Sequence, residues 1–252
     1  MIHWSLLEEH LKTHYFYKIN NNKNKTIVLF GNCHLLPITY YLNAKLLYSY
    51  NIIVVISWFY ERTFTSDELV SVNKQIEDIV RSCDIFIYQK HNNSFGIHAN
   101  NIISFVNSKC ILLNVPNFLL DYLSTKSTSS DIEILKKDFI ASLFRLSTSI
   151  TESDFTEFEF IVANIYQVQF FNTIYHPTHY LLYLLSTSIY NKIMNIPEKI
   201  TIHDYYDKKT REEFLSIELK DFIYLPGKSE LSPINHDITG IHYGADYFDI
   251  TF

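Results

Sequence analysis

The sequence predicts an α/β fold: a small, mainly parallel sheet of about four strands flanked by helices, followed by a predominantly helical C-terminal half. Three observations predict it. Four short apolar runs of strand length lie within the first 115 residues, helical patterns separate them, and the apolar runs stop at the polar segment 126–131. Strands that alternate with helices are typical of βαβ units with right-handed crossovers.

The four predicted strands are rich in β-branched and aliphatic residues. Their nearly continuous apolar runs suit strands that are buried on both faces, as in a parallel sheet. They cover residues 26–30, 51–58, 84–89 and 110–115. Ligands of open α/β sheets bind outside the carboxyl ends of the strands, so functional residues are expected directly after them.

Helical periodicity predicts the intervening elements of residues 1–125. Apolar residues recur at helical intervals on one side of an amphipathic segment at 3–18 and again within 66–83. Thr65 and Glu68 stand at capping-box spacing at the start of the latter segment. The four helices predicted in this half cover residues 3–18, 35–49, 66–83 and 97–108.

The second half, residues 126–252, is predicted to be mainly helical and to pack with residues 1–125 as one compact unit with a shared cleft. Ser153 is a candidate N-cap, and Pro177 suits the first residue of a helix. The predicted helices cover residues 131–147, 153–171, 177–194 and 207–220, with loops beyond them.

Composition narrows the class of protein. The chain has 252 residues, of which 47% are hydrophobic, and its net charge is −6. No basic face is evident, so nucleic acid is not an expected partner. No apolar stretch reaches the roughly 18 residues of a membrane span, and the acidic N-terminus is unlike a signal peptide. Three cysteines without a CxxC pair favour a reducing compartment over a disulfide framework, so we expect a cytoplasmic protein.

The first candidate constellation is the sequence Gly31-Asn32-Cys33-His34, directly after the first predicted strand. Glycine permits a sharp strand-to-helix turn and a close backbone approach. The three residues behind it would lie at a helix N-terminus, where outward N–H groups and the helix dipole stabilise a thiolate, an oxyanion or a phosphate. The alternative is that Gly-Asn serves only the turn and that Cys33 is a small buried hydrophobe.

The second constellation is the segment from His176 to His179, which includes Pro177. Pro177 makes His176 a candidate N-cap, and a helix N-terminus disfavours imidazolium, so His176 should be neutral and able to act as a general base. The alternative is that His176 only caps the helix and His179 is solvated. No carboxylate stands at helical spacing beside this histidine pair, so no metal site is predicted.

Polar residues also follow the third and fourth predicted strands. Gln89 closes the third strand and His91 follows it, and Asn117 comes after the fourth. Both turn formation and ligand binding account for such residues. The sequence contains no G-x-S-x-G, no P-loop and no G-x-G-x-x-G, which disfavours an ordinary lipase, a P-loop NTPase and a typical dinucleotide site.

Taken in order, the motifs resemble those of the WcbI-like polysaccharide-biosynthesis acetyltransferases. They are V-L-F-G-N-C-H, C-D-I-F-I-Y-Q, L-L-N-V-P-N and Y-H-P-T-H-Y, and the resemblance spans roughly residues 26–195. The first motif of that family usually reads G-N-C-Q, so His34 replaces a glutamine here. The H-P-[TN] segment of the family matches at His176, Pro177 and Thr178.

This resemblance implies a cytosolic enzyme that binds coenzyme A or acetyl-CoA and acetylates a sugar, such as a nucleotide-sugar, in capsule or glycan assembly. Cys33, Asn32 and His176 are then the expected catalytic residues. The expected coenzyme-binding residues are Gly31, His34, Gln89 and His179, and the expected substrate-binding residues are His91 and Asn117. No metal is expected, and the oligomeric state is left open.

Two other functions fit the same residues. An esterase or deacetylase resembling the SGNH hydrolases also places a nucleophile and an asparagine at strand ends, but it needs a serine where this chain has Cys33. A non-catalytic sugar- or nucleotide-binding module would use some of the 19 tyrosines and 19 phenylalanines to stack on sugar rings.

Overall fold

The protein is described here from a computed structural model. It describes residues 16–20, 22–57, 64–90, 99–119, 132–165, 168, 170–173 and 176–216, of which residues 99, 100, 132, 133, 135, 136, 172, 173 and 176 are described by backbone alone. Most of the predicted helix at 3–18, residue His91 and the tail from residue 217 onward lie outside these ranges.

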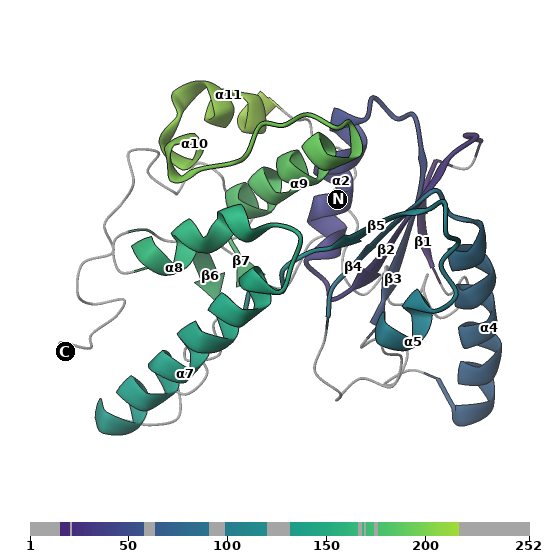
Figure 1. The fold of residues 1–252 in the computed structure, drawn as a ribbon, viewed down its shortest axis with the longest axis horizontal. Helices are drawn as coiled ribbons and strands as arrows, with labels where there is room; N and C mark the ends of the chain where they lie inside the picture. The colour runs from purple at the N-terminus through teal and green to yellow at the C-terminus, as the bar shows by residue number, and fades with distance from the viewer. Residues whose placement is uncertain are drawn as a thin grey trace.

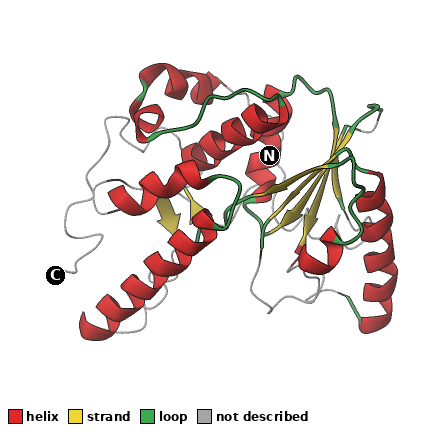
Figure 2. Cartoon of the chain, in the orientation of Figure 1, coloured by secondary structure: helices red, strands yellow, loops and turns green. Residues whose placement is uncertain are grey.

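A five-stranded sheet forms the centre of the first half (Figures 1 and 2), with the strand order β1-β3-β2-β4-β5. The four strands predicted from apolar runs are confirmed, and they are parallel to one another. The strands are β1 (Tyr17–Ile19), β2 (Thr26–Gly31), β3 (Asn51–Ile56), β4 (Ile85–Tyr88) and β5 (Ile111–Asn114).

The strand count of four was wrong by one. Tyr17–Ile19 forms β1 and pairs antiparallel with β3, Tyr17 opposite Val54. Tyr17 and Lys18 had been assigned to the end of the predicted helix at 3–18. Without β1, the outer edge of β3 would expose unpaired N–H and C=O groups. Pairing along that edge therefore outweighed the local helical pattern at these residues.

Helices cover both faces of the sheet: α2 (Leu35–Lys45), α4 (Ser66–Ser82) and α5 (Ala99–Ile103). The chain runs from β2 outward to β3 and then crosses back over β2 to β4. Right-handed crossovers in opposite directions place their helices on opposite faces. Figure 1 accordingly shows α2 on one face and α4 with α5 on the other.

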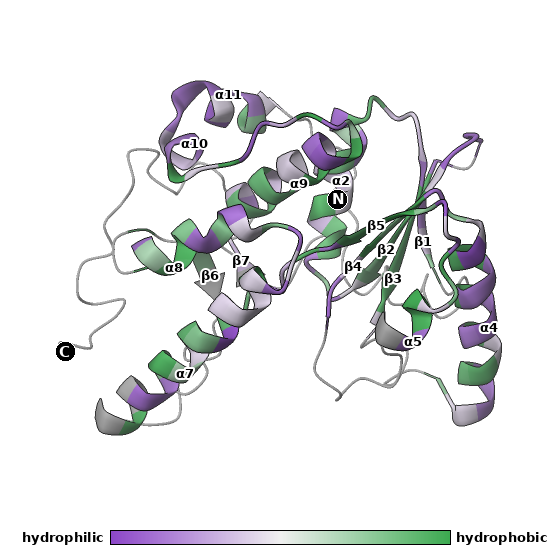
Figure 3. Cartoon of the chain, in the orientation of Figure 1, coloured by the Kyte–Doolittle hydropathy of each residue, from purple (hydrophilic) through white to green (hydrophobic). Residues whose placement is uncertain are grey.

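The predicted capping box at the start of α4 is confirmed. The backbone N–H of Thr65 donates to Glu68 Oε2 at 2.8 Å, and the backbone N–H of Glu68 donates to Thr65 Oγ1 at 3.5 Å. Val72, Ile76 and Val80 are the buried residues of this helix. The central strands are apolar on both sides, as the green strands of Figure 3 illustrate, and β2 is buried from Ile27 to Gly31.

The second half is mainly helical and contains one short two-stranded sheet, β6 with β7. Its elements are α7 (Ile132–Thr151), the 3-10 helix η1 (Thr156–Glu159), α8 (Phe160–Asn164), β6 (Phe171–Thr173), β7 (His176–Pro177), α9 (His179–Ile193), α10 (Ile202–Tyr206) and α11 (Lys208–Ser216). Helix α10 was not predicted. None of the helices among the described residues is long and apolar enough to cross a lipid bilayer.

Two helix assignments in this half were wrong. The predicted helix at 153–171 is instead η1, the short α8 and then a strand, and Ser153 is not its N-cap. Ser153 Oγ donates to the carbonyl of Ile150 at 2.7 Å and accepts the N–H of Phe155 at 3.0 Å, so it closes the turn after α7. A hydroxyl that bonds nearby backbone groups favours turns as readily as helix starts.

The second error concerns the start of α9. His176 and Pro177 lie in β7, and the N-cap is Thr178, whose Oγ1 accepts the N–H of Leu181 at 3.2 Å. The N–H of Thr178 in turn donates to the carbonyl of Phe170 at 2.8 Å. This tertiary hydrogen bond and the pairing of β7 with β6 hold residues 176–177 extended.

Helix α9 packs on α2 and thereby joins the two halves. Tyr41 Oη lies 3.0 Å from His179 Nδ1, and one turn further along both helices Lys45 Nζ donates to Tyr183 Oη at 3.2 Å. Both contacts advance by four residues in the same direction, so α2 and α9 run parallel. Their N-termini therefore point toward the same end of the molecule.

Candidate functional site

The site lies at the carboxyl ends of β2 and β4. The connection after β2 leads to a helix on one face of the sheet, and the connection after β4 leads to a helix on the other face (Figure 1). Neighbouring parallel strands whose connections diverge in this way leave a crevice between their ends, where ligands of open α/β sheets bind. Gly31 is the last residue of β2, and Gln89 directly follows the last residue of β4.

Gly31 lies in close contact with two side chains. A Cβ at this position would lie 2.5 Å from Gln89 Oε1 and 2.8 Å from Leu35 Cδ1. Both distances are shorter than non-bonded contacts allow, so any larger residue must displace a neighbour. The absence of a side chain lets Gln89 fold across the end of β2, where it reaches the next residue of the turn.

Three amide side chains near the ends of three strands belong to one hydrogen-bond network there, in which Gln89 bonds to backbone groups and Asn32 bonds to the Asn117 side chain. Gln89 Oε1 accepts the backbone N–H of Asn32 at 2.9 Å, and Gln89 Nε2 donates to the carbonyl of Pro116 at 3.2 Å. Asn32 Nδ2 donates to Asn117 Oδ1 at 2.7 Å. The structure therefore brings together four predicted site residues, Gly31, Asn32, Gln89 and Asn117.

Backbone partners determine the orientation of these amides. The N–H of His34 donates to Asn32 Oδ1 at 2.8 Å, so the oxygen of that side chain faces the turn and its nitrogen faces Asn117. Gln89 is oriented by the Asn32 N–H on one side and the Pro116 carbonyl on the other. Nδ2 of an asparagine has two hydrogens, and one of those on Asn32 is used by Asn117.

Cys33 and His34 complete the turn between β2 and α2. The N–H of Leu35 donates to the carbonyl of Asn32 at 3.2 Å, and the N–H of Leu36 donates to the carbonyl of Cys33 at 3.1 Å. Cys33 is half-buried at the N-terminal end of α2, whereas the His34 side chain is only 1% exposed. The dipole of α2 favours negative charge at this end.

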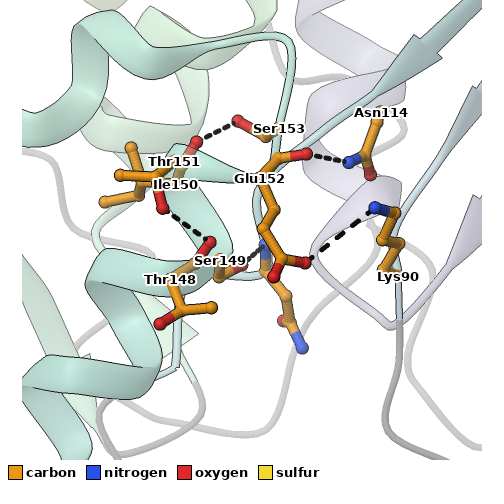
Figure 4. A network of polar contacts seen from close by, with 9 residues as sticks. Lys90, Asn114, Thr148, Ser149, Ile150, Thr151, Glu152 and Ser153 are labelled. Atoms are coloured by element: carbon orange, nitrogen blue, oxygen red, sulfur yellow. Dashed lines mark hydrogen bonds and ion pairs between the residues drawn. The ribbon is translucent and has the colours of Figure 1, made fainter.

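A second polar network joins the site to α7 (Figure 4). The N–H of Asn117 donates to Ser149 Oγ at 2.8 Å, Asn114 Nδ2 donates to the carbonyl of Glu152 at 2.7 Å, and Lys90 Nζ lies 3.9 Å from a Glu152 oxygen. These bonds fix the end of β5 against the second half of the chain. Asn117, which meets Asn32, is thus held by α7.

Asn114 and its partner Asp154 were missed by the sequence reasoning. Asp154 Oδ2 accepts the N–H of Asn114 at 2.6 Å, and Asn114 Oδ1 is buried without a hydrogen-bond partner among the described residues. Burial, and then the charge of Asp154, raise the pKa of Tyr88. The available signal was an asparagine that ends an otherwise apolar strand.

The predicted histidines have different positions. The imidazole of His179 is buried between α9 and α2, so its solvated alternative was wrong, and it packs edge-on against the Tyr41 ring. The backbone of His176 lies in β7, which leads directly into the N-terminus of α9. Because α2 and α9 run parallel, the N-terminus of α2 lies at the same end of the molecule. The His176 side chain and all of His91 lie outside what the structure describes.

Among the described residues, no group of three or more His, Cys, Asp and Glu side chains is arranged to hold a metal ion. The donors gathered at the site are instead amides, a thiol and backbone groups. Such groups hold neutral or anionic ligands through hydrogen bonds.

Comparison with known proteins gave one structural likeness. The sequence matches no protein-family model, and no curated protein is significantly similar to it. Among solved structures, the chain is similar to WcbI, described as a novel polysaccharide biosynthesis enzyme, in a form without a disulfide bond between coenzyme A and a cysteine. The TM-score is 0.46 at 13% identity, over 70% of this chain and 71% of that one.

Proposed function

We propose that the chain is an acetyl-CoA-dependent acetyltransferase that acts on a sugar or nucleotide-sugar in polysaccharide or glycan biosynthesis. The observation that carries the proposal is that the Asn32 amide is held in one orientation and that the next residue in the sequence is Cys33, a half-buried thiol at a helix N-terminus. A thiol next to a fixed N–H donor suits acyl transfer. The sugar acceptor and coenzyme A come from the sequence resemblance alone.

Asn32 is the proposed oxyanion donor. The backbone N–H groups of Asn32 and His34 already donate to Gln89 and to the Asn32 side chain. The second hydrogen of Asn32 Nδ2 therefore takes the role that we expected Asn32 to share with backbone N–H groups near Cys33. A donor that is oriented before the reaction costs no reorganisation when charge develops on the acetyl oxygen.

In the proposed mechanism Cys33 forms a covalent intermediate. The Cys33 thiolate attacks the thioester carbonyl, a tetrahedral oxyanion forms near Asn32, and the thiolate of coenzyme A leaves. His176 then takes the proton of the acceptor hydroxyl or amine, whose oxygen or nitrogen attacks the acetyl-cysteine and releases Cys33. Cys33 is released as the thiolate with which the cycle began. The proton on His176 passes to solvent, which supplies the proton taken up by the coenzyme A thiolate after it leaves, so the imidazole is neutral again.

The first test is whether acetyl-CoA alone acetylates the protein. We expect one acetyl group per chain by intact mass and peptide mapping, located on Cys33 and removed when a suitable sugar acceptor is added. Cys33→Ser should abolish the adduct and turnover. Cys110→Ser is the matched control, because it changes a cysteine at the amino end of β5, and it should retain both the acetyl adduct and turnover. Undiminished turnover by Cys33→Ser would rule out the covalent route.

The second test separates chemistry from binding. His176→Ala should lower kcat by about 10²–10⁴ and Asn32→Ala by about 10²–10³, both with little change in acetyl-CoA affinity. Weakened binding without a kcat effect contradicts these roles. Hydrolysis of acetyl esters without coenzyme A would instead support an esterase, and sugar binding without any transfer would support a binding module.

A further inference from the structure

Two cysteines that the proposed function does not use lie in contact at the amino ends of β4 and β5, away from the candidate site at the carboxyl ends. Cys83 immediately follows α4, and Cys110 immediately precedes β5. Their sulfur atoms are 3.6 Å apart, although the residues are far apart in the sequence. The sequence analysis treated the three cysteines as widely spaced, and the fold brings two of them together.

We propose that Cys83 and Cys110 form a reversible intramolecular disulfide by exchange with a small-molecule disulfide such as oxidised glutathione. A disulfide needs the sulfurs at about 2.0 Å, so they must approach by roughly 1.6 Å. Cys83 caps α4 in an extended conformation and Cys110 lies in a turn, so neither belongs to the regular part of a helix or strand. Side-chain rotation and a small backbone adjustment can supply this approach.

The surrounding backbone keeps the two thiols together. Asp84, next to Cys83, donates its N–H to the carbonyl of Thr26 at 3.0 Å and accepts the N–H of Ile111, next to Cys110, at 2.9 Å. The neighbours of both cysteines are thus fixed to the sheet at the amino ends of the strands. The contact between the sulfurs is therefore a stable feature of the fold.

The two thiols differ in a way that sets the order of the reaction. Cys110 is half-buried, whereas Cys83 is only 4% exposed. The hydrogen bond between the two thiols lowers the pKa of Cys110, and the same bond together with burial raises the pKa of Cys83. Cys110 is thus the accessible thiol with more thiolate character, which is the property that governs attack on a disulfide.

The exchange has two balanced steps. The Cys110 thiolate attacks one sulfur of the small-molecule disulfide, whose S–S bond breaks to release one thiol and leave a mixed disulfide on Cys110. Cys83 loses its proton and attacks the Cys110 sulfur, and the second thiol of the reagent leaves. Two protein thiols are oxidised, one small-molecule disulfide is reduced to two thiols, and the two protein hydrogens end on those thiols.

The experiment uses the full chain equilibrated in glutathione buffers of increasing oxidised fraction, quenched with acid, alkylated and mapped by mass spectrometry. We expect a linked pair of peptides containing Cys83 and Cys110, reversed by excess reduced glutathione. The oxidised protein should also melt about 5–10 °C higher than the reduced protein, because the bond closes the chain between residues 83 and 110. Cys33→Ser is the matched control and should retain the linked pair and the shift.

Two single variants test the order of attack. Cys83→Ala should stop the reaction at a glutathione adduct on Cys110, and Cys110→Ala should leave Cys83 unmodified. The proposal is overturned if wild type keeps both cysteines alkylatable in every buffer, or if it retains the adduct on Cys110 without forming the linked pair. These readouts need no acetyltransferase activity, so they are independent of the proposed function.

Discussion

At the scale of single residues, the arrangement of the site depends on Gly31, which has no side chain. Gly31 leaves room for Gln89 to cross the end of β2 and to accept the Asn32 N–H. The orientation of the Asn32 side chain is then fixed, because its Oδ1 accepts the backbone N–H of His34 and its Nδ2 donates to Asn117. A network in which each amide has a defined partner holds its side chains in fixed orientations.

Gly31→Ala should therefore affect both stability and the site. The added methyl would lie 2.5 Å from Gln89 Oε1, so either Gln89 loses its bond to Asn32 or the backbone shifts. We expect a loss of roughly 1–3 kcal/mol in the free energy of unfolding, measured by urea denaturation. In the double variant Gly31→Ala/Gln89→Ala the loss should be smaller than the sum of the two single losses. Additive losses would contradict this steric account.

At the scale of elements, α4 depends on its N-terminal capping box. Thr65 and Glu68 satisfy each other's backbone N–H groups, which have no partner within the helix. Backbone and side-chain hydrogen bonds from Thr65 lower the pKa of Glu68. Since the folded pKa lies below the ordinary value of 4.5, the stabilisation is present above that pH and is lost as the pH falls through the lowered pKa.

Thr65→Ala should destabilise the protein by about 1 kcal/mol at neutral pH, as expected for the loss of an N-cap. The difference in unfolding midpoint between wild type and Glu68→Gln should shrink as the pH is lowered from 6 toward 3, an acid range set by the ordinary and lowered pKa values. Ser66→Ala, at the neighbouring exposed position, is the control for changes at this helix start. A pH-independent difference for Glu68→Gln would contradict the role assigned to its carboxylate.

At the scale of the whole molecule, the two halves meet in a cluster of aromatic rings between α2, α9 and α11. Tyr41 contacts Tyr183 and Phe214 edge-on, with ring centroids 5.7 and 5.8 Å apart, and Tyr180 packs on the same phenylalanine. Lys45 lies 4.3 Å from the centroid of the Tyr183 ring. Edge-on aromatic pairs and cations over rings stabilise such interfaces beyond the burial of area alone.

This cluster predicts alkaline unfolding. Burial raises the pKa of Tyr41, Tyr180 and Tyr183, the last to about 12. Because the folded values lie above the ordinary 10.0, the contribution of these tyrosines to stability is complete below pH 10 and is lost as the pH rises toward the folded values. Burial also lowers the pKa of Lys45, which opposes part of this loss between its lowered value and 10.5.

The urea midpoint of wild type should therefore fall as the pH rises from 10 toward 12, a window set by the ordinary and raised pKa values of Tyr183. Tyr183→Phe should flatten this dependence, although it also loses the hydrogen bond from Lys45 at every pH. Tyr48→Phe, at an exposed tyrosine, is the matched control and should keep the wild-type slope. Equal slopes for Tyr183→Phe and wild type would disprove the assignment.

Much of the fold was predictable because its signals are local. The apolar runs at β2 to β5, the periodicity of α4 and its capping box each depend on residues within one segment. Fold errors occurred where a distant partner decides the outcome. Tyr17–Ile19 forms a strand because it pairs with the outer edge of β3. Residues 176–177 are extended, and not helical as Pro177 suggested, because they pair with β6 and because Thr178 bonds to Phe170.

The sequence alone determined that Gly31, Asn32, Gln89 and Asn117 would follow strands of one sheet, because the carboxyl ends of parallel strands meet at one edge. Only the tertiary structure decided which of them bond to one another, that Asn114 and Asp154 join them, and that Cys83 touches Cys110. The physical reason is the distance along the chain over which each kind of interaction acts. Propensity and periodicity act over a few residues, whereas strand order and the packing of α7 and α9 set contacts between residues far apart in the chain.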